Sequence, residues 1–461
     1  LSSEVCPEIR EYERFTTTVA NAYVRPLMAS YLAGLRERLA AMGLACPVLL
    51  MTSGGGLTTL ENAMQFPIRL VESGPAGGAI LATKVAREMG LDKVISFDMG
   101  GTTAKICLIG NYRPQTAREF EVDRAARFTK GSGFPLRIPV IEMVEIGAGG
   151  GSIARLDALS RVTIGPDSAG ADPGPAAYGR GGEKPTITDA DVALGKIDPD
   201  SFAGGKVPLY PARAEDAIMA DVGTPLGVAG VTTAAYGITE MVDETMANAA
   251  RVHAVEQGKA ANEHSMIAFG GAAPLHAGRL AEKLQIDRII VPIDAGVGSA
   301  VGFLEAPVAY DVVRSRNMRL FAFDPAAINA VMAEMREEAE AVIRPAAPDA
   351  TLDERRVAFM RYVGQGHEIA VELPDGTFDE RHRDVIQAAF DAEYERHFRR
   401  TLPNAETEIL TWSLSVSAGS APPPTLRRHP AAPPRAYYSL KVLSCQRLLS
   451  IRSAHPLHLW A

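Results

Sequence analysis

The sequence has few cysteines, no long apolar run and no excess of positive charge, and each absence excludes a class of protein. The four cysteines lie far apart without a Cys-x-x-Cys pair, so neither a disulfide framework nor a zinc ribbon is indicated. No apolar stretch is long enough to cross a membrane and no signal peptide pattern is present, so we expect a cytoplasmic protein. A formal net charge of −8 without a basic run argues against nucleic acid as the main partner. The remaining composition is that of an ordinary globular protein, long enough at 461 residues for two or three domains.

The most informative stretch lies between residues 94 and 109. Residues 94–97 and 104–109 are apolar apart from Lys105, which predicts two buried strands. The segment between them has the composition of a turn, with one acid, two glycines and two hydroxyl residues: Asp98, Gly100, Gly101, Thr102 and Thr103. Such a turn can surround a phosphate with backbone N–H groups, and its acid is placed to act through Mg²⁺. The alternative is an ordinary hairpin with a Gly-Gly turn.

Other glycine-rich segments follow predicted strands or begin predicted helices. Because open α/β sheets bind ligands at the carboxyl ends of their strands, we expect residues 54–56, 98–102, 147–151 and 270–271 to converge on one cleft. Residues 72–78 begin a predicted helix whose first N–H groups could receive an anion. Tight helix packing is an equal alternative for the glycines of that segment.

Apolar residues at helical spacing predict long helices over residues 12–42 and 228–256. In the first helix the apolar positions include Val19, Tyr23 and Leu27, and Pro26 is expected to kink or split it. The later part of the chain, residues 321–417, combines charged amphipathic helices over 326–344 and 381–398 with strands over 356–362, 367–373 and 412–416.

Two positions near predicted helix starts carry side chains that could act in a site. His276 follows a predicted strand and the double glycine and leads into a predicted helix over residues 277–284, a place where a lone histidine is more often structural than catalytic. Asp189 and Asp191 stand near another helix start, where capping by Thr188 or Asp189 is favoured over a place in the site.

Several motifs, read together, resemble the hydantoinase A/5-oxoprolinase family in order over about residues 1–420. They are Glu72-Ser-Gly-Pro-Ala-Gly-Gly, Phe97-Asp-Met-Gly-Gly-Thr-Thr, Gly170-Ala-Asp-Pro-Gly-Pro-Ala-Ala-Tyr-Gly, Phe269-Gly-Gly-Ala-Ala-Pro-Leu-His-Ala and Tyr362-Val-Gly-Gln-Gly. The resemblance implies an α/β fold of the actin-like, sugar-kinase-like ATPase type, in which two ribonuclease-H-like halves enclose a nucleotide cleft. Members of that family begin with a further domain bearing its own Asp-x-Gly-Gly-Thr loop, and this sequence has one such loop.

The resemblance also implies a division of the chain into four parts. Residues 1–92 would be the remainder of the first ribonuclease-H-like half, and residues 93–320 the second half with its phosphate loop. Residues 321–420 would form a C-terminal α+β domain. Residues 421–461 would be a proline-rich linker followed by a tail, and because the tail after about residue 436 matches nothing in the family, we interpret it as unstructured or non-native. We therefore expect the chain to be a fragment that lacks the N-terminal domain.

Carried over residue by residue, the resemblance makes Asp98 the catalytic residue, which would orient Mg²⁺ or water, and the ligand of Mg²⁺. Nucleotide contacts would come from two sets of residues, Gly100, Gly101, Thr102 and Thr103 on the phosphate side and Gly270, Gly271 and Ala272 on the adenosine side. The family hydrolyses cyclic amides such as 5-oxoproline or a hydantoin, using ATP to phosphorylate the amide oxygen and so remove the amide resonance.

Two other functions agree with the same motifs. One is the ATP-using subunit of an acetone or acetophenone carboxylase, and the other is a non-catalytic, actin-like nucleotide-binding module. The implied partners are a small cyclic amide and a hydantoinase B-type subunit or domain, within an oligomer, with no nucleic acid and no membrane.

Overall fold

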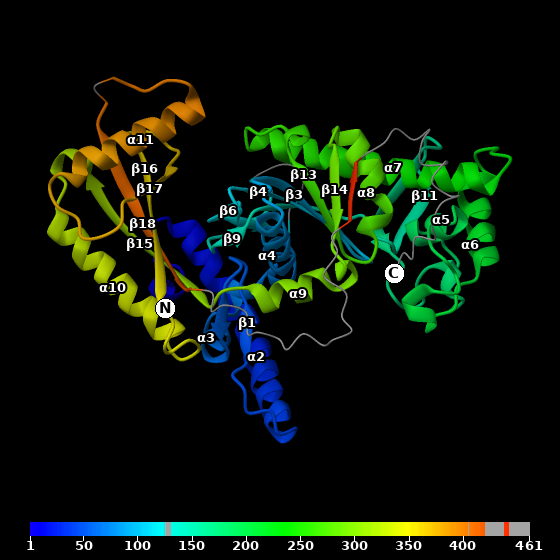
Figure 1. Cartoon of the computed structure of the whole chain (residues 1–461), viewed down its shortest axis with the longest axis horizontal. Coiled ribbons are helices and arrows are strands. Elements are labelled where there is room, and N and C mark those ends of the chain that lie inside the picture. Colours follow the sequence, from blue (N-terminus) through cyan, green and yellow to red (C-terminus); the bar gives the residue numbers. More distant parts are fainter. Residues whose placement is uncertain (124, 126–130, 404, 420–437, 442–461) are drawn as a thin grey trace. The chain divides into compact units, whose positions relative to one another are not determined.

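A computed structural model of the chain describes residues 1–123, 125, 131–403, 405–419 and 438–441 (Figure 1). The chain forms two compact units. The first comprises Leu1–Ala76, Thr116–Val140 and Ala306–His429, and the second comprises Gly77–Gln115, Ile141–Glu305 and Pro430–Ala461. The four-part division implied by the resemblance stays a prediction, and most of the segment after residue 421 lies outside the described residues.

The second unit is built on a seven-stranded sheet with the strand order β10-β4-β3-β13-β14-β19, in which β5 pairs with β4 (Figure 1). Its strands are β3 (Lys93–Met99), β4 (Ala104–Gly110), β5 (Arg113–Pro114), β10 (Met143–Ile146), β13 (Ser265–Phe269), β14 (Arg288–Val291) and β19 (Tyr438–Lys441). The pairs β3–β13 and β13–β14 are parallel, and the others are antiparallel. The strand β19 was not expected, because residues 437–461 show no sustained period.

Helices cover both faces of this sheet. On one face, α7 (Val231–Glu256) and α8 (Ala273–Leu284) share a hydrophobic core with β3, β4 and β13. The predicted helix over residues 228–256 is thus confirmed, beginning at Val231 after the extended Gly230. The remaining elements of this unit include β11 (Ser152–Leu156), β12 (Val162–Ser168), α5 (Ile187–Ala193) and α6 (Pro211–Ile218).

On the opposite face, α4 (Ser73–Glu88) approaches α9 (Gly298–Glu305) closely through glycines. A Cβ atom on Gly302 would overlap the carbonyl oxygen of Gly77, and one on Gly78 would lie 2.6 Å from the ring of Phe269. Because backbone meets backbone here, no larger residue fits at Gly302. Close packing therefore accounts for two glycines of residues 72–78, in agreement with the second alternative for that segment.

The first unit contains a four-stranded antiparallel sheet with the order β15-β18-β16-β17. Its strands are β15 (Ala309–Arg319), β16 (Leu352–Tyr362), β17 (Ile369–Glu372) and β18 (Thr407–Ala418). The helices α10 (Pro325–Ile343) and α11 (His382–Phe398) pack on one face of this sheet around Trp412 and Phe390. These elements confirm the helices and strands predicted for residues 321–417, whereas β15 was not predicted.

The other main helix of the first unit is α2 (Glu11–Ala41), which joins α1 (Ser2–Val5), β1 (Leu49–Met51), β2 (Leu57–Thr59) and α3 (Leu60–Gln65). Pro26 lies inside α2 without splitting it, so of the two expected effects, a kink or a split, the split is wrong. Its apolar residues Val19, Tyr23 and Leu27 are exposed, while Thr17 and Asn21 are buried. None of the helices within the described residues is long and apolar enough to span a membrane.

Candidate functional site

The candidate site is built around the hairpin of β3 and β4. The two strands are antiparallel neighbours, and Asp98 lies directly opposite Lys105, which confirms the predicted pair of buried strands. The structure differs in one respect, because β3 continues to Met99 and so places Asp98 within the strand instead of in the turn. The fully buried Met99 pairs with Ala104 and extends the ladder by two residues. The turn proper comprises residues 100–103, where the Gly100 N–H donates to the Thr103 carbonyl oxygen at 3.1 Å.

One side of the turn is closed by residues 149–151, the first glycine segment. The N–H groups of Gly150 and Gly151 donate to the carbonyl oxygens of Gly100 and Gly101, at 3.0 and 2.7 Å. A Cβ atom on Gly149 would lie 2.6 Å from the carbonyl carbon of Gly101 and closer still to the Thr102 nitrogen. The backbone therefore packs directly against the turn, and a side chain at position 149 would displace it.

The other side is closed by residues 270–272, the second glycine segment. The strand β13 is the parallel neighbour of β3 and places Phe269 opposite Asp98, so the residues that follow reach the turn. The Ala272 N–H donates to the Met99 carbonyl oxygen at 2.9 Å. Gly270 has a φ of +93°, and a Cβ atom there would lie 2.5 Å from Asp98 Oδ1. Glycine is required at this position by both its backbone angle and its distance from the carboxylate.

Three of the four glycine-rich segments expected to share a cleft thus meet at one place. The fourth, residues 54–56, belongs to the other compact unit, where a Cβ atom on Gly56 would lie 2.8 Å from Ala309 Cβ. Its participation in the cleft stays a prediction.

The carboxylate of Asp98 is half-buried and has two polar neighbours. Ser299 Oγ donates a hydrogen bond to Asp98 Oδ2 at 3.0 Å, and Lys105 lies on the adjoining strand, where it also pairs with Glu145 at 3.2 Å. Burial raises the pKa of the Asp98 carboxyl above its ordinary value, although the Ser299 hydrogen bond and the Lys105 charge oppose this.

Sequence reasoning assigned no role to Ser299 or Lys105, and each had only a weak signal. Ser299 stands in a glycine-rich run between residues 296 and 302, and Lys105 is the one charge in an apolar strand.

The predicted nucleotide-contacting residues differ in exposure. Gly101, Thr102 and Gly271 are exposed, Gly100 and Thr103 are half-buried, and Ala272 is buried. The outer part of the turn is therefore accessible to a ligand, whereas Ala272 can contribute backbone only.

Within the part of the chain that the structure describes, no group of three or more His, Cys, Asp or Glu side chains could hold a metal ion. One carboxylate beside a hydroxyl does not provide a zinc cage. It does fit Mg²⁺, which proteins commonly bind through one or two carboxylates together with phosphate oxygens and water.

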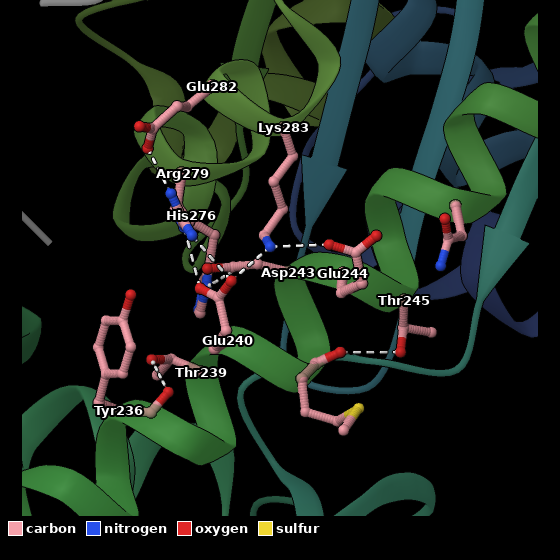
Figure 2. Close-up of polar contacts among 12 residues, drawn as sticks. Tyr236, Thr239, Glu240, Asp243, Glu244, Thr245, His276, Arg279, Glu282 and Lys283 are labelled. Carbon is pink, nitrogen blue, oxygen red and sulfur yellow. Dashed lines mark hydrogen bonds and ion pairs between the residues drawn. The ribbon is translucent and has the colours of Figure 1, made fainter. Parts of the chain in front are cut away.

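His276 lies behind the second glycine segment and is fully buried. Its Nδ1 contacts Asp243 Oδ1 at 2.8 Å (Figure 2), and its Nε2 contacts Asp191 Oδ2 at 3.1 Å. Asp189 accepts hydrogen bonds from backbone N–H groups, including that of Ala177 at 2.7 Å, and completes a capping box at the start of α5. The N-cap residue is Thr186, so the expected N-cap, Thr188 or Asp189, was placed two or three residues too late. The carboxylates of Asp189 and Asp191 thus both form hydrogen bonds with other groups of the protein.

Comparison with known proteins adds an independent line of information. The sequence pattern that defines the hydantoinase/oxoprolinase family matches residues 14–312. An uncharacterized protein of Methanocaldococcus jannaschii is 39% identical over 84% of this chain and 57% of its own length. Caprolactamase subunit alpha of Pseudomonas jessenii is 33% identical over 91% of this chain and 60% of its own length. The chain thus spans less than two thirds of these relatives.

Two solved structures share the fold. The ATP-dependent caprolactamase of Pseudomonas jessenii matches with a TM-score of 0.75 and 32% identity, over 92% of this chain and 60% of that chain. Nucleotide-free acetone carboxylase matches with a TM-score of 0.72 and 26% identity, over 91% of this chain and 59% of that chain. These matches confirm the predicted fold class, the α/β fold of the actin-like ATPase type.

Proposed function

Since this chain belongs to the hydantoinase/oxoprolinase family, we propose that it holds the nucleotide phosphates in an enzyme that uses ATP to hydrolyse a cyclic amide. One observation carries the proposal, namely the turn of residues 100–103, which has a glycine segment on each side and a half-buried carboxylate at its base. The similarity to an ATP-dependent caprolactamase supports both the nucleotide and the cyclic amide.

Each part of the turn has a distinct role in this proposal. The backbone N–H of Gly101 and the hydroxyl of Thr102 would contact phosphate oxygens, whereas Gly100 shapes the turn through the hydrogen bond from its N–H to the Thr103 carbonyl oxygen. Thr103 ends the turn and Lys105 supplies positive charge beside it. Asp98 would hold Mg²⁺, which when bound supplies charge stabilisation for the transferred phosphoryl group. Ser299 fixes the Asp98 carboxylate by its hydrogen bond. Gly270, Gly271 and Ala272 present backbone toward the adenosine side of the nucleotide.

The chemistry follows from the stability of the amide. Attack by the amide oxygen on the γ-phosphorus forms a new P–O bond and breaks the bond to the ADP oxygen, which removes the amide resonance. Water then adds to the activated carbon, and the ring C–N bond breaks as the nitrogen takes a proton, which leaves an acyl phosphate and a free amine. A second water cleaves the acyl phosphate to the carboxylate and inorganic phosphate. The chain contributes by positioning and by electrostatic stabilisation.

The test is ATP hydrolysis by the purified chain with and without 5-oxoproline, a hydantoin or caprolactam. Because the chain spans 60% of caprolactamase subunit alpha, we expect full activity to require a partner subunit or domain, and the assay is repeated with a hydantoinase B-type protein added. Turnover that depends on one of these amides and disappears in Asp98→Asn supports the proposal. ATP binding without any amide-dependent turnover would instead indicate a nucleotide-binding module.

A second candidate is the ATP-using subunit of a ketone carboxylase, which the similarity to acetone carboxylase favours. The two candidates differ in their second substrate. A carboxylase would hydrolyse ATP only when bicarbonate and a ketone are both present, whereas the amidohydrolase needs neither. The same assay therefore separates them when acetone or acetophenone with bicarbonate replaces the amide.

A further inference from the structure

Behind the two glycine segments lies a cluster of four charged side chains. The His276, Asp191 and Asp243 side chains are at most 2% exposed, and Lys196 Nζ reaches Asp191 Oδ1 at 3.0 Å. Both ring nitrogens of His276 face carboxylates, so the imidazolium form can donate a hydrogen bond to each. Two positive and two negative charges then balance, as burial of charge requires.

Three members of this cluster belong to three different helices, and the fourth, Lys196, follows α5 in the chain. His276 stands in the first turn of α8, directly after the second glycine segment. Asp191 lies in α5, whose Thr188 N–H donates at 2.8 Å to the carbonyl oxygen of Gly150 in the first glycine segment. Asp243 lies in α7. The contact between Asp191 and His276 therefore joins the helix that follows one glycine segment to the helix that contacts the other.

These contacts form a continuous series that begins and ends at the turn. Hydrogen bonds connect the turn to Gly150, and Gly150 to α5. The His276–Asp191 contact then connects α5 to α8, the helix that follows the second glycine segment. The second glycine segment is in turn connected to the turn, because the Ala272 N–H donates to the carbonyl oxygen of Met99, one residue before the turn. His276 is thus connected to both sides of the turn through these contacts, although it touches neither side itself.

We propose that His276 is a positioning residue that fixes the separation of the two glycine segments around the turn of residues 100–103 by joining α5 to α8. The inference rests on the proposed function only for the identity of the ligand, a nucleoside triphosphate. A buried ion pair that served stability alone would be replaceable by apolar residues without consequence for the turn.

The structure offers a matched control in a second ionic cluster between α7 and α8 (Figure 2). Arg279 Nη2 and Lys283 Nζ contact Glu240 Oε1 at 2.8 and 2.5 Å, and Lys283 contacts Glu244 at 2.8 Å. These groups are partly exposed, and their ion pairs run between α7 and α8. Loss of Glu240 weakens the α7–α8 contact and leaves the Asp191–His276 contact in place.

The test compares His276→Gln, Asp191→Asn and the control Glu240→Gln by hydrogen exchange, well below their melting temperatures. In the first two variants we expect the Gly150 and Gly151 amides to exchange about tenfold faster, because they donate to the turn. Amides of β16 and β18 in the other unit should be unaffected. The Kd for ATP with Mg²⁺ should rise about two- to thirtyfold in these variants and remain unchanged in Glu240→Gln.

Unchanged exchange at Gly150 and Gly151, an equal increase throughout the second unit, or the same increase in Glu240→Gln would overturn the inference. Should His276→Gln fail to fold, Asp191→Asn still decides the question, because it keeps the His276–Asp243 pair. Failure of both to fold would make the cluster a general stability element and would also overturn it. A wild-type chain that binds no ATP would refute the proposed function separately, since the exchange measurement needs no nucleotide.

Discussion

The close approach at Gly149 makes a quantitative prediction. In Gly149→Ala the new methyl group would lie 2.6 Å from the carbonyl carbons of Gly101 and Thr102, whereas nonbonded carbon atoms prefer about 3.5–4.0 Å. The neighbours are backbone atoms of the turn, so they cannot move aside as the end of a flexible side chain would. We expect the turn to shift by roughly 1 Å and unfolding to become easier by about 1–3 kcal/mol.

The assay is thermal unfolding, with Gly100→Ala as the matched control. Gly100 lies in the same turn, but a Cβ atom there would meet no atom within 4 Å. Gly149→Ala should melt lower by about 2–4 °C for each kcal/mol lost, and Gly100→Ala should remain close to the wild type. If the two variants melted at the same temperature, the first glycine segment would not be packed against the turn as described, and the reasoning would be refuted.

Three further predictions concern charge and helix stability. Asp98→Asn should retain the fold but lose amide-dependent ATP turnover by about 10²–10³-fold, and a variant with wild-type turnover would remove Asp98 from the chemistry. Burial acts to lower the pKa of His276, but Asp191 and Asp243 outweigh it and raise the pKa to about 9. This group's contribution to stability, on the order of 3 kcal/mol, should therefore be complete below about pH 6.5 and lost as the pH rises through 9. Urea unfolding at several pH values checks this, because the free energy of unfolding of His276→Gln should not show this decrease between pH 6.5 and 9. Gly237→Ala, inside α7 with no atom within 4 Å of the new methyl group, should stabilise the protein by about 0.5–1 kcal/mol, and a lower melting temperature would contradict it.

The features that could be predicted from the sequence are those determined by residues close to one another in the chain. The hairpin was predictable because apolar runs flank a Gly-Gly turn, and the glycine segments were recognisable because each follows a strand or begins a helix. The function of Ser299 could not be predicted, because its hydrogen-bond partner Asp98 lies 201 residues away in the chain. The same is true of His276, whose two carboxylates come from other helices.

Burial and pairing also depend on distant residues. The strand β15 was missed because its charged and polar residues resemble a loop until it pairs with β18, where Ala309 meets Ser417. In α2 the apolar residues predicted the helix but not its buried face. Thr17 is buried because its hydroxyl accepts the Arg137 N–H at 2.8 Å, and Asn21 because its side chain bonds to Gln65 and Ile68. Such hydrogen bonds satisfy the polar groups of Thr17 and Asn21 when they are buried, whereas the apolar pattern alone predicts that these residues face solvent.

The arrangement of the turn also determines when it can form during synthesis. The hairpin of β3 and β4 can close as soon as it leaves the ribosome, because its strands are adjacent in the chain. The first glycine segment arrives later, and β13 with the second segment arrives much later still. Parallel pairing of β3 with β13 has to wait for that long intervening chain, which makes it a slow step that leaves strand edges open to aggregation. A nascent chain that stops before Ser265 would therefore carry the hairpin with one edge of β3 unpaired, and chaperone capture of such intermediates should cease once β13 has emerged.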